Sequence, residues 1–228
     1  IETNNRIVES LKSEFRNGIV ISRSKIEDYI KEADCILIGP GLPRKEGQEE
    51  GDDDTRELTE RLFHSHPDKK WVVDGGSLQV IEPSILPKTA IVTPHKGEFK
   101  KLFSVEATDE NVEGMAKKFG IVILVKGEYD VVASPFDSGS TPLTTGAQGK
   151  PTSVRISGGN PGMTKGGTGD VLAGLIAAFY CKNDAFLSAA AGSYINKRAG
   201  EALEKKMGVY FNASDLASEI PTVMKELL

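Results

Sequence analysis

The chain has 228 residues, 39% of them hydrophobic, and its 28 Lys and Arg against 33 Asp and Glu give a net charge of −5. This content of hydrophobic residues excludes a disordered or collagen-like chain. The acidic balance argues against nucleic acid as a partner, because a phosphate-backbone binder carries a basic surface. No apolar run approaches the roughly 20 residues that cross a bilayer, and the first residues lack a signal-peptide pattern. We therefore expect a soluble, cytoplasmic protein that binds no membrane.

The length and the cysteine content predict one large α/β unit. No linker rich in Ser, Gly or Pro divides the sequence, so we expect a single domain over residues 1–228. Cys35 and Cys181 each lie within an apolar run. Two reduced thiols are therefore expected rather than a disulfide.

Short runs rich in Val and Ile alternate with segments of helical period. Five of these runs have the pattern of strands buried on both faces, namely residues 18–21, 35–38, 71–73, 90–92 and 121–125. Ser24 and Asp54 each precede a glutamate by three residues, which is the spacing of a capping box, and both predict helix starts. The alternation predicts a doubly wound α/β fold with a mostly parallel central sheet and helices on both faces.

The second half of the chain has a different pattern. Residues 130–134 and 153–157 predict an antiparallel pair of strands joined by a long loop. Long helices are expected over residues 167–180 and 185–205, and a last helix near Ser214. The acidic stretch 44–54 predicts a solvated loop, with a metal-recruiting or lid role as the alternative.

A glycine-rich stretch leads directly into an apolar helix. Its sequence is Ser157-Gly-Gly-Asn-Pro-Gly-Met-Thr-Lys-Gly-Gly-Thr-Gly-Asp170. Gly166, Gly167 and Gly169 leave backbone amides open at the helix start, where the helix dipole adds about half a positive charge. This arrangement favours a cradle for phosphate. The alternative is a glycine turn needed only to enter a tightly packed helix.

Asp170 adds a carboxylate to the first turn of that helix. Beside a phosphate cradle it repels the ligand, unless it serves a metal or a proton transfer. Such a group can accept the proton of an attacking hydroxyl while the adjacent amides hold the phosphoryl group. We expect the helix dipole to lower the pKa of Asp170, so that this carboxylate acts late in the phosphoryl transfer.

Further motifs accompany the glycine stretch in a fixed order across almost the whole chain. They are Gly39-Pro-Gly-Leu42, Thr93-Pro-His-Lys-Gly-Glu98 and Lys126-Gly127. Together these motifs resemble the ADP- or ATP-dependent NAD(P)H-hydrate dehydratases of the ribokinase-like superfamily. The resemblance implies a ribokinase-like fold and a hydro-lyase that repairs hydrated NADH and NADPH. It also implies Mg²⁺ as cofactor, ADP or ATP as co-substrate, and a homo-oligomer, since tetramers are common in the family.

The resemblance also implies roles for single residues. Asp170 would contact the hydrated nicotinamide and take the hydroxyl proton. His95 and Gly41 would face the dinucleotide substrate. Glu98 would position Mg²⁺ through water. The nucleotide site would be formed by Lys126, Gly127, Glu128, Tyr129, Asp130, Gly167, Thr168 and Gly169.

The residue types leave simpler alternatives at the Thr-Pro-His motif and at the next strand end. His95 stands at a predicted helix start, where a histidine can be a surface residue or a cap, and Glu98 can be a plain first-turn carboxylate. Lys126 can be an idle solvated lysine. Asp74, at the end of the 71–73 run, is a plausible strand-end ligand.

The sequence departs from the family pattern at three places. Many members carry a second acidic residue two positions after the aspartate that corresponds to Asp74, whereas this chain has Gly76, and Pro43 stands where glycine is usual. We find no counterpart of the family's first strand and helix, so we expect the domain to lack them. Two other functions stay open: a small-molecule kinase of the same superfamily, and a nucleotide-binding protein without catalysis.

Overall fold

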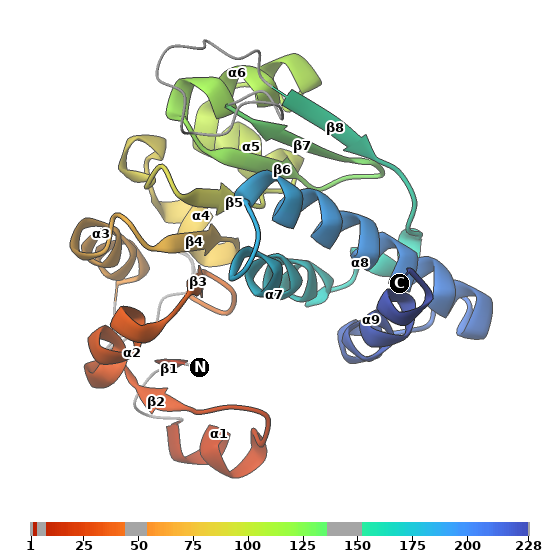
Figure 1. Ribbon diagram of the computed structural model, residues 1–228, viewed down its shortest axis with the longest axis horizontal. Helices are drawn as coiled ribbons and strands as arrows, with labels where there is room; N and C mark the ends of the chain where they lie inside the picture. Colours follow the sequence, from red (N-terminus) through yellow and green to blue (C-terminus); the bar gives the residue numbers. More distant parts are fainter. Residues whose placement is uncertain (1, 4–7, 44–53, 136–151, 228) are drawn as a thin grey trace.

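The centre of the protein is a six-stranded sheet with the strand order β3-β4-β5-β6-β7-β8 (Figure 1). The computed structural model describes residues 2–3, 8–43, 54–135 and 152–227. Strands β3 to β6 pair in parallel, and β7 and β8 continue the sheet in antiparallel pairs. The strands are Cys35–Ile38 (β3), Lys70–Val73 (β4), Ala90–Val92 (β5), Val122–Val125 (β6), Asp130–Ser134 (β7) and Thr152–Ile156 (β8). The predicted mostly parallel sheet and its antiparallel end are confirmed.

Helices occupy both faces of this sheet. The helices between β3 and β6 are Thr55–Ser65 (α3), Gly75–Val80 (α4), Lys96–Phe103 (α5) and Asp109–Phe119 (α6), with a 3₁₀ turn at Pro83–Ile85 (η3). After β8 come Pro161–Thr164 (η4), Thr168–Tyr180 (α7), Ala185–Met207 (α8) and Ala213–Leu227 (α9). The three predicted C-terminal helices are therefore present.

The N-terminal part forms a small unit beyond β3 (Figure 1). Its elements are Glu2–Thr3 (β1), Val8–Glu14 (α1), Ile21–Ser22 (β2), Arg23–Lys25 (η1) and Ile26–Glu32 (α2). Strands β1 and β2 pair in parallel and form a separate two-stranded sheet. The predicted strand over residues 18–21 is thus largely wrong, because only Ile21 of that run is in β2.

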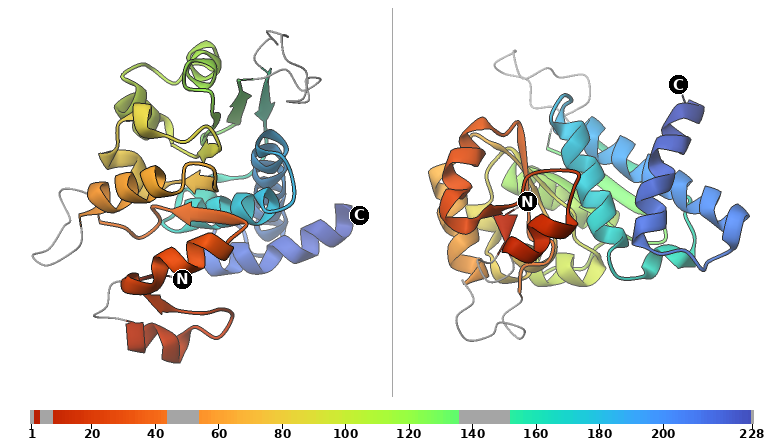
Figure 2. Two further views of the ribbon diagram at one scale, coloured as in Figure 1. Left: turned by 60° about the vertical axis from the view of Figure 1, so that its left-hand side comes forward. Right: turned by 90° about the horizontal axis from the view of Figure 1, so that it is seen from below.

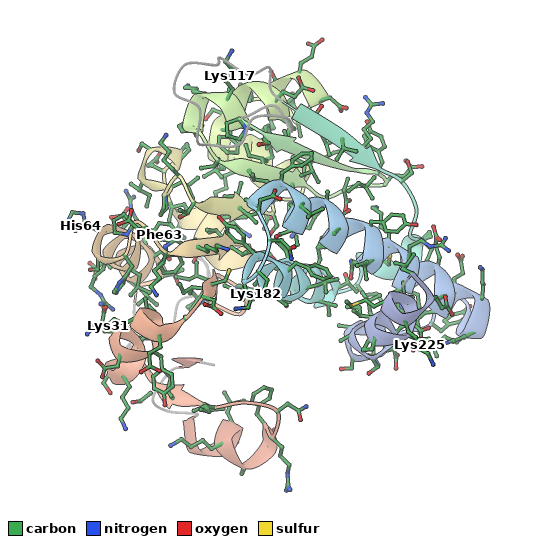
Figure 3. All side chains as sticks on the ribbon, viewed as in Figure 1. Lys31, Phe63, His64, Lys117, Lys182 and Lys225 are labelled. Atoms are coloured by element: carbon green, nitrogen blue, oxygen red, sulfur yellow. The ribbon has the colours of Figure 1, made fainter. Side chains whose placement is uncertain are left out.

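The alternation of side chains along each strand builds two cores. Trp71 and Val73 of β4 pack in a cluster with α3, α4, α5 and α6, whereas Val72 belongs to a second cluster with α7 and α8. Successive side chains of a strand point to opposite faces, so one apolar run supplies both cores. Figure 2 shows α7 and α8 on one side of the sheet and the earlier helices on the other. On α3, Phe63 points toward the sheet and His64 away from it (Figure 3).

Helix α7 has two apolar sides, one facing the sheet and the other facing a cluster formed with α8 and α9. Leu172 and Ile176 pack on the sheet, while Val171 and Leu175 pack in a third cluster formed with α8 and α9.

Within the described residues, none of the helices combines the length and the apolar character that crossing a membrane requires. The predicted loops over 44–54 and 136–152 fall almost wholly outside the described residues.

One of the two predicted helix caps is confirmed. The Asp54 carboxylate accepts hydrogen bonds from the amides of Arg56 and Glu57, at 2.7 and 3.0 Å, and caps α3. The capping box predicted at Ser24 is wrong.

Ser24 lies inside η1, and α2 begins after Lys25 without a side-chain cap. The Glu27 carboxylate, which the box required, instead pairs with Arg61 and His66 of the α3 region. These contacts lower the pKa of Glu27, so tertiary partners have replaced the local cap.

We expect two glycine-to-alanine variants on neighbouring helices to have opposite effects on stability. In Gly192→Ala the new Cβ would lie 2.6 Å from Cγ1 of Ile176, so overpacking outweighs the gain in helix propensity, for a net loss of about 1 kcal/mol or more. A Cβ at Gly174 meets nothing within 4 Å, so Gly174→Ala gains up to about 1 kcal/mol. Urea denaturation measures both values, and a stabilised Gly192→Ala would contradict the close packing of α7 on α8.

Candidate active site

Hydrogen bonds to one buried carboxylate link the carboxyl ends of three adjacent strands. Asp74 follows β4, Thr93 follows β5 and Lys126 follows β6. Oδ1 of Asp74 accepts hydrogen bonds from Thr93 Oγ1 at 2.8 Å and from Lys126 Nζ at 2.7 Å. The Asp74 side chain is 3% exposed and that of Lys126 is 20% exposed. Lys126 is therefore a fixed, partly buried cation and not an idle solvated lysine.

The loop after β3 approaches the β4 end so closely that it requires glycine. Gly39 has φ +112°, and a Cβ on it would lie 1.7 Å from the carbonyl oxygen of Asp74. A Cβ on Gly76 would lie 2.2 Å from the carbonyl oxygen of Leu42. The missing second acid at position 76 thus has a steric reason in this chain. Gly41, at φ +72°, has no atom within 4 Å of its Cβ position and leaves the loop surface open.

Helix α7 begins beside the Lys126 ammonium. Gly167 is its N-cap, with φ +88° in the left-handed region that favours glycine. A Cβ on Gly169 would lie 3.3 Å from Lys126 Nζ, so the absence of a side chain there lets the ammonium lie over the first turn. The Thr168 hydroxyl donates to the carbonyls of Met163 and Lys165 and fixes the preceding loop. The amides and the cation together form a positive site suited to a phosphate.

The pKa of the Asp170 carboxylate is raised above the ordinary value of an aspartate. Burial raises its pKa, the nearby Asp74 carboxylate raises it further, and Lys126 lowers it. We expected the helix dipole to lower the pKa, and this expectation is wrong, because desolvation and the charge of Asp74 outweigh the favourable charges. A raised pKa makes Asp170 a better proton acceptor than an ordinary surface aspartate.

His95 and Glu98 form a reciprocal capping box at the start of α5. The His95 Nδ1 atom accepts from the amides of Gly97 and Glu98, and Glu98 Oε2 accepts from the His95 amide at 2.9 Å. The capping alternative is therefore realised at His95, and Glu98 is a first-turn carboxylate that completes the box. A neutral ring that accepts through Nδ1 carries its proton on Nε2. Nε2 lies 3.6 Å from Glu98 Oε2, beyond hydrogen-bonding distance, and the His95 side chain is 58% exposed, so this donor is available to a ligand.

A cavity of about 710 Å³ extends from the strand ends along α7 and α8. Six of the residues predicted for the nucleotide site line it, namely Lys126, Gly127, Glu128, Asp130, Thr168 and Gly169, and so does His95. The predicted site residues outside this lining are Gly41, Glu98, Tyr129, Gly167 and Asp170. Tyr129 instead packs its ring against the guanidinium of Arg155, 4.9 Å from the ring centroid. Lys126 lines the cavity and also interacts with Asp170, so it connects the two parts of the site.

The opposite wall of the cavity depends on Lys197, which sequence reasoning did not single out. Its Nζ donates to the carbonyls of Gly127, Glu128 and Gly158 at 3.2, 3.2 and 3.3 Å, and lies 3.3 Å from Asp130 Oδ1. Both charged side chains are at most 7% exposed. This buried cation joins the loop after β6 to the loop after β8. The available sequence clue was the pair Asn196 and Lys197, because the other buried positions of α8 are mostly Ala, Gly and Ser.

The donor set fits one Mg²⁺ ion held mainly by water and phosphate. Among the described residues, no three His, Cys, Asp or Glu side chains gather in a metal-ligating cluster. Glu98 is held by Gln79 Nε2, at 3.0 Å, and by the His95 amide, and each of its oxygens keeps a second lone pair. Mg²⁺ usually keeps several waters and is bound through one or two carboxylates and substrate phosphates.

The fold and this site define an α/β protein of the ribokinase-like class. A ribokinase-like superfamily protein from Enterococcus faecalis has a solved structure that matches with a TM-score of 0.76 at 25% identity, over 99% of this chain and 75% of that one. A family model described as NAD(P)H-hydrate dehydratase matches residues 1–222. The chain therefore belongs to the NAD(P)H-hydrate dehydratase family.

Two curated relatives are similar in sequence. An ADP-dependent (S)-NAD(P)H-hydrate dehydratase of Nitrosopumilus maritimus is 44% identical over 154 residues, 63% of this chain and 48% of that protein. A bifunctional NAD(P)H-hydrate repair enzyme of Archaeoglobus fulgidus is 36% identical over 198 residues, 86% of this chain and 36% of that protein. The chain thus spans about half the length of these relatives or less.

We expect Lys197→Met to destabilise the protein by about 3–5 kcal/mol, because it leaves the buried Asp130 carboxylate without its cation. Arg198→Met on the next position is the matched control, since Arg198 is 47% exposed and its pair with Glu201 contributes about 0–1 kcal/mol. Urea denaturation measures both. Equal effects of the two substitutions would show that Lys197 does not hold the cavity wall.

Proposed function

We propose that this protein dehydrates hydrated NADH or NADPH back to the reduced dinucleotide, with phosphoryl transfer from ADP or ATP and release of phosphate. The observation that supports this most is the meeting of three groups at the start of α7. Gly169 leaves its backbone open, the Lys126 ammonium lies over it, and the Asp170 carboxylate has a raised pKa. The first two suit a terminal phosphate, and the third suits a hydroxyl proton.

The chemistry assigns a separate task to each group. The hydroxyl oxygen on the nicotinamide ring attacks the terminal phosphorus while the bond from phosphorus to the nucleotide oxygen breaks. Asp170 takes the hydroxyl proton as the new ester forms. The carbon–oxygen bond of the ester then breaks, inorganic phosphate leaves, and loss of a proton from the neighbouring ring carbon restores the double bond. Lys126 and the α7 amides hold the transferring group throughout, so that catalysis is mainly positioning and electrostatics.

Other residues bind and orient the two substrates. The nucleotide occupies the cavity between Gly127–Asp130 and α8, and the hydrated nicotinamide lies near Gly41 and the Nε2 donor of His95. Glu98 holds Mg²⁺ through water, and the ion when bound neutralises phosphate charge. The homo-oligomeric state stays a prediction from the family resemblance, and the cytoplasmic location stays a prediction from the sequence.

A small-molecule kinase is the second candidate, because a kinase uses the same phosphate site and the same proton acceptor. The products distinguish the two functions. A stable phosphate ester supports the kinase, whereas inorganic phosphate together with restored reduced nicotinamide supports the dehydratase.

The direct test is an assay of hydrated NADH with ADP and then ATP, with Mg²⁺ present and after chelation, followed by the absorbance of the reduced nicotinamide. We expect Asp170→Asn to lower kcat by about 10²- to 10⁴-fold while nucleotide binding stays largely intact, since the general base is lost and the cradle is kept. The exposed carboxylate variant Asp68→Asn is the control and should keep wild-type turnover. Full turnover in Asp170→Asn would refute the assigned role.

The dependence of kcat/KM on pH should report the raised pKa of Asp170. Only its deprotonated form accepts a proton, so activity should fall as the pH drops through a value above the ordinary 3.8 of an aspartate. In Asp74→Asn the removal of a nearby negative charge should move this acid limb to lower pH. Circular dichroism at each pH separates titration from acid unfolding. An acid limb at the same pH in both proteins would contradict the coupling of the two carboxylates.

A further inference from the structure

The Glu98 carboxylate is hydrogen-bonded at both of its oxygens, by groups from two different helices. Oε2 accepts from the His95 amide at 2.9 Å, within the capping box of α5, and Oε1 accepts from the side-chain Nε2 of Gln79 at 3.0 Å. The Glu98 side chain is only 7% exposed. The cap of α5 needs the first of these two contacts alone. The contact from Gln79, on α4, therefore has a purpose that helix capping does not explain.

The contact from Gln79 fixes the plane of the Glu98 carboxylate. An ionised carboxylate only accepts hydrogen bonds, so Gln79 must present its amide NH₂ group to Glu98 and not its carbonyl oxygen. The terminal torsion of a glutamate is broad, so a carboxylate held at one oxygen can turn about its last bond. A donor at each oxygen removes this freedom. Gln79 thus selects one orientation of the Glu98 carboxylate.

The place of Gln79 on α4 connects this orientation to the rest of the site. Gln79 lies in the last turn of α4, the helix that begins directly after Asp74. The start of α4 is bound to the loop after β3, because the amide of Gly76 donates to the carbonyl of Gly39 at 3.0 Å. One end of α4 is therefore anchored beside the Lys126–Asp74 pair, and the other end holds Glu98. A side chain on a helix held in this way is a rigid support for a functional group.

We infer that Gln79 is a positioning residue for Mg²⁺, which holds the Glu98 carboxylate so that its free lone pairs face the water shell of the ion. This inference rests on the proposed function in taking Glu98 as the residue that holds Mg²⁺ through water. Hydrogen-bond partners that orient a metal-binding group typically contribute about 10- to 100-fold to metal affinity. Because a water lies between Glu98 and the ion, we expect the lower end of this range.

The test is isothermal titration calorimetry of the protein with ADP, once with Mg²⁺ and once with EDTA. The ratio of the two affinities measures the contribution of the ion, separately from that of the nucleotide site itself. Gln79→Met keeps the length of the side chain and removes its donor. We expect this variant to lower the ratio by about 10-fold, while its affinity for ADP in EDTA stays within about twofold of the wild type. Gln79→Leu serves the same purpose if the methionine variant does not fold, as judged by its thermal unfolding.

Two further variants complete the experiment. Asn111→Leu on α6 is the control, because it removes a side-chain amide hydrogen bond of 2.8 Å to the Glu106 carbonyl outside the site, and it should keep the wild-type ratio. Glu98→Gln is the reference for loss of the carboxylate itself, and it should lower the ratio at least as much as Gln79→Met.

The outcomes separate the inference from the proposed function. A wild-type ratio in Gln79→Met beside a lowered ratio in Glu98→Gln would overturn the inference, while the proposed Mg²⁺ role of Glu98 stands. Equal affinities with Mg²⁺ and with EDTA in the wild type, or a wild-type ratio in Glu98→Gln, would overturn both. The expected ratios without any restoration of NADH would instead reject the proposed dehydration and leave the role of Gln79 standing.

Discussion

The hydrogen-bonded ion pair between Lys126 and Asp74 is the contact on which the site depends. It joins the ends of β4 and β6, which are separated by β5, and the Thr93 hydroxyl at the end of β5 donates to the same carboxylate oxygen. A buried pair of this kind is costly to desolvate and contributes little net stability. Its effect is geometric, because it holds one ammonium over the first turn of α7. Without it the helix start would be a glycine turn near a mobile lysine.

A second buried lysine builds the other side of the cavity, and the two lysines act differently. Lys126 presents a point charge toward the cavity. Lys197 instead donates hydrogen bonds to three backbone carbonyls and forms an ion pair with Asp130. An ammonium group has three donors that can be aimed separately, which suits this task. Ser193, one turn before Lys197, donates to Asp130 as well. Helix α8 therefore supports one wall of the cavity through the buried polar residues Ser193 and Lys197.

Two residues of the Thr-Pro-His motif serve the fold and the proposed chemistry together. The capping box fixes His95 and Glu98 through backbone amides, which leaves the histidine Nε2 atom as a donor and holds the glutamate carboxylate in place. A structural role is thus no argument against a functional one at these positions. The capping hydrogen bonds are the means by which α5 orients the His95 and Glu98 side chains near the strand ends.

Sequence alone determined the fold class, the order of most elements and the place where chemistry concentrates. Short continuous apolar runs, a glycine stretch before an apolar helix and an aspartate in its first turn are local patterns, and local patterns are visible along the chain. Only the tertiary structure decided three features: the pairing of Lys126 with Asp74, the hydrogen bonds of Lys197 and the Oδ1 atom of Asn196, which is unpaired among the described residues. Each depends on residues 39 or more positions apart, or on burial by another helix. The sign of the pKa shift of Asp170 belongs with them, since desolvation and a neighbouring carboxylate arise only when distant segments meet.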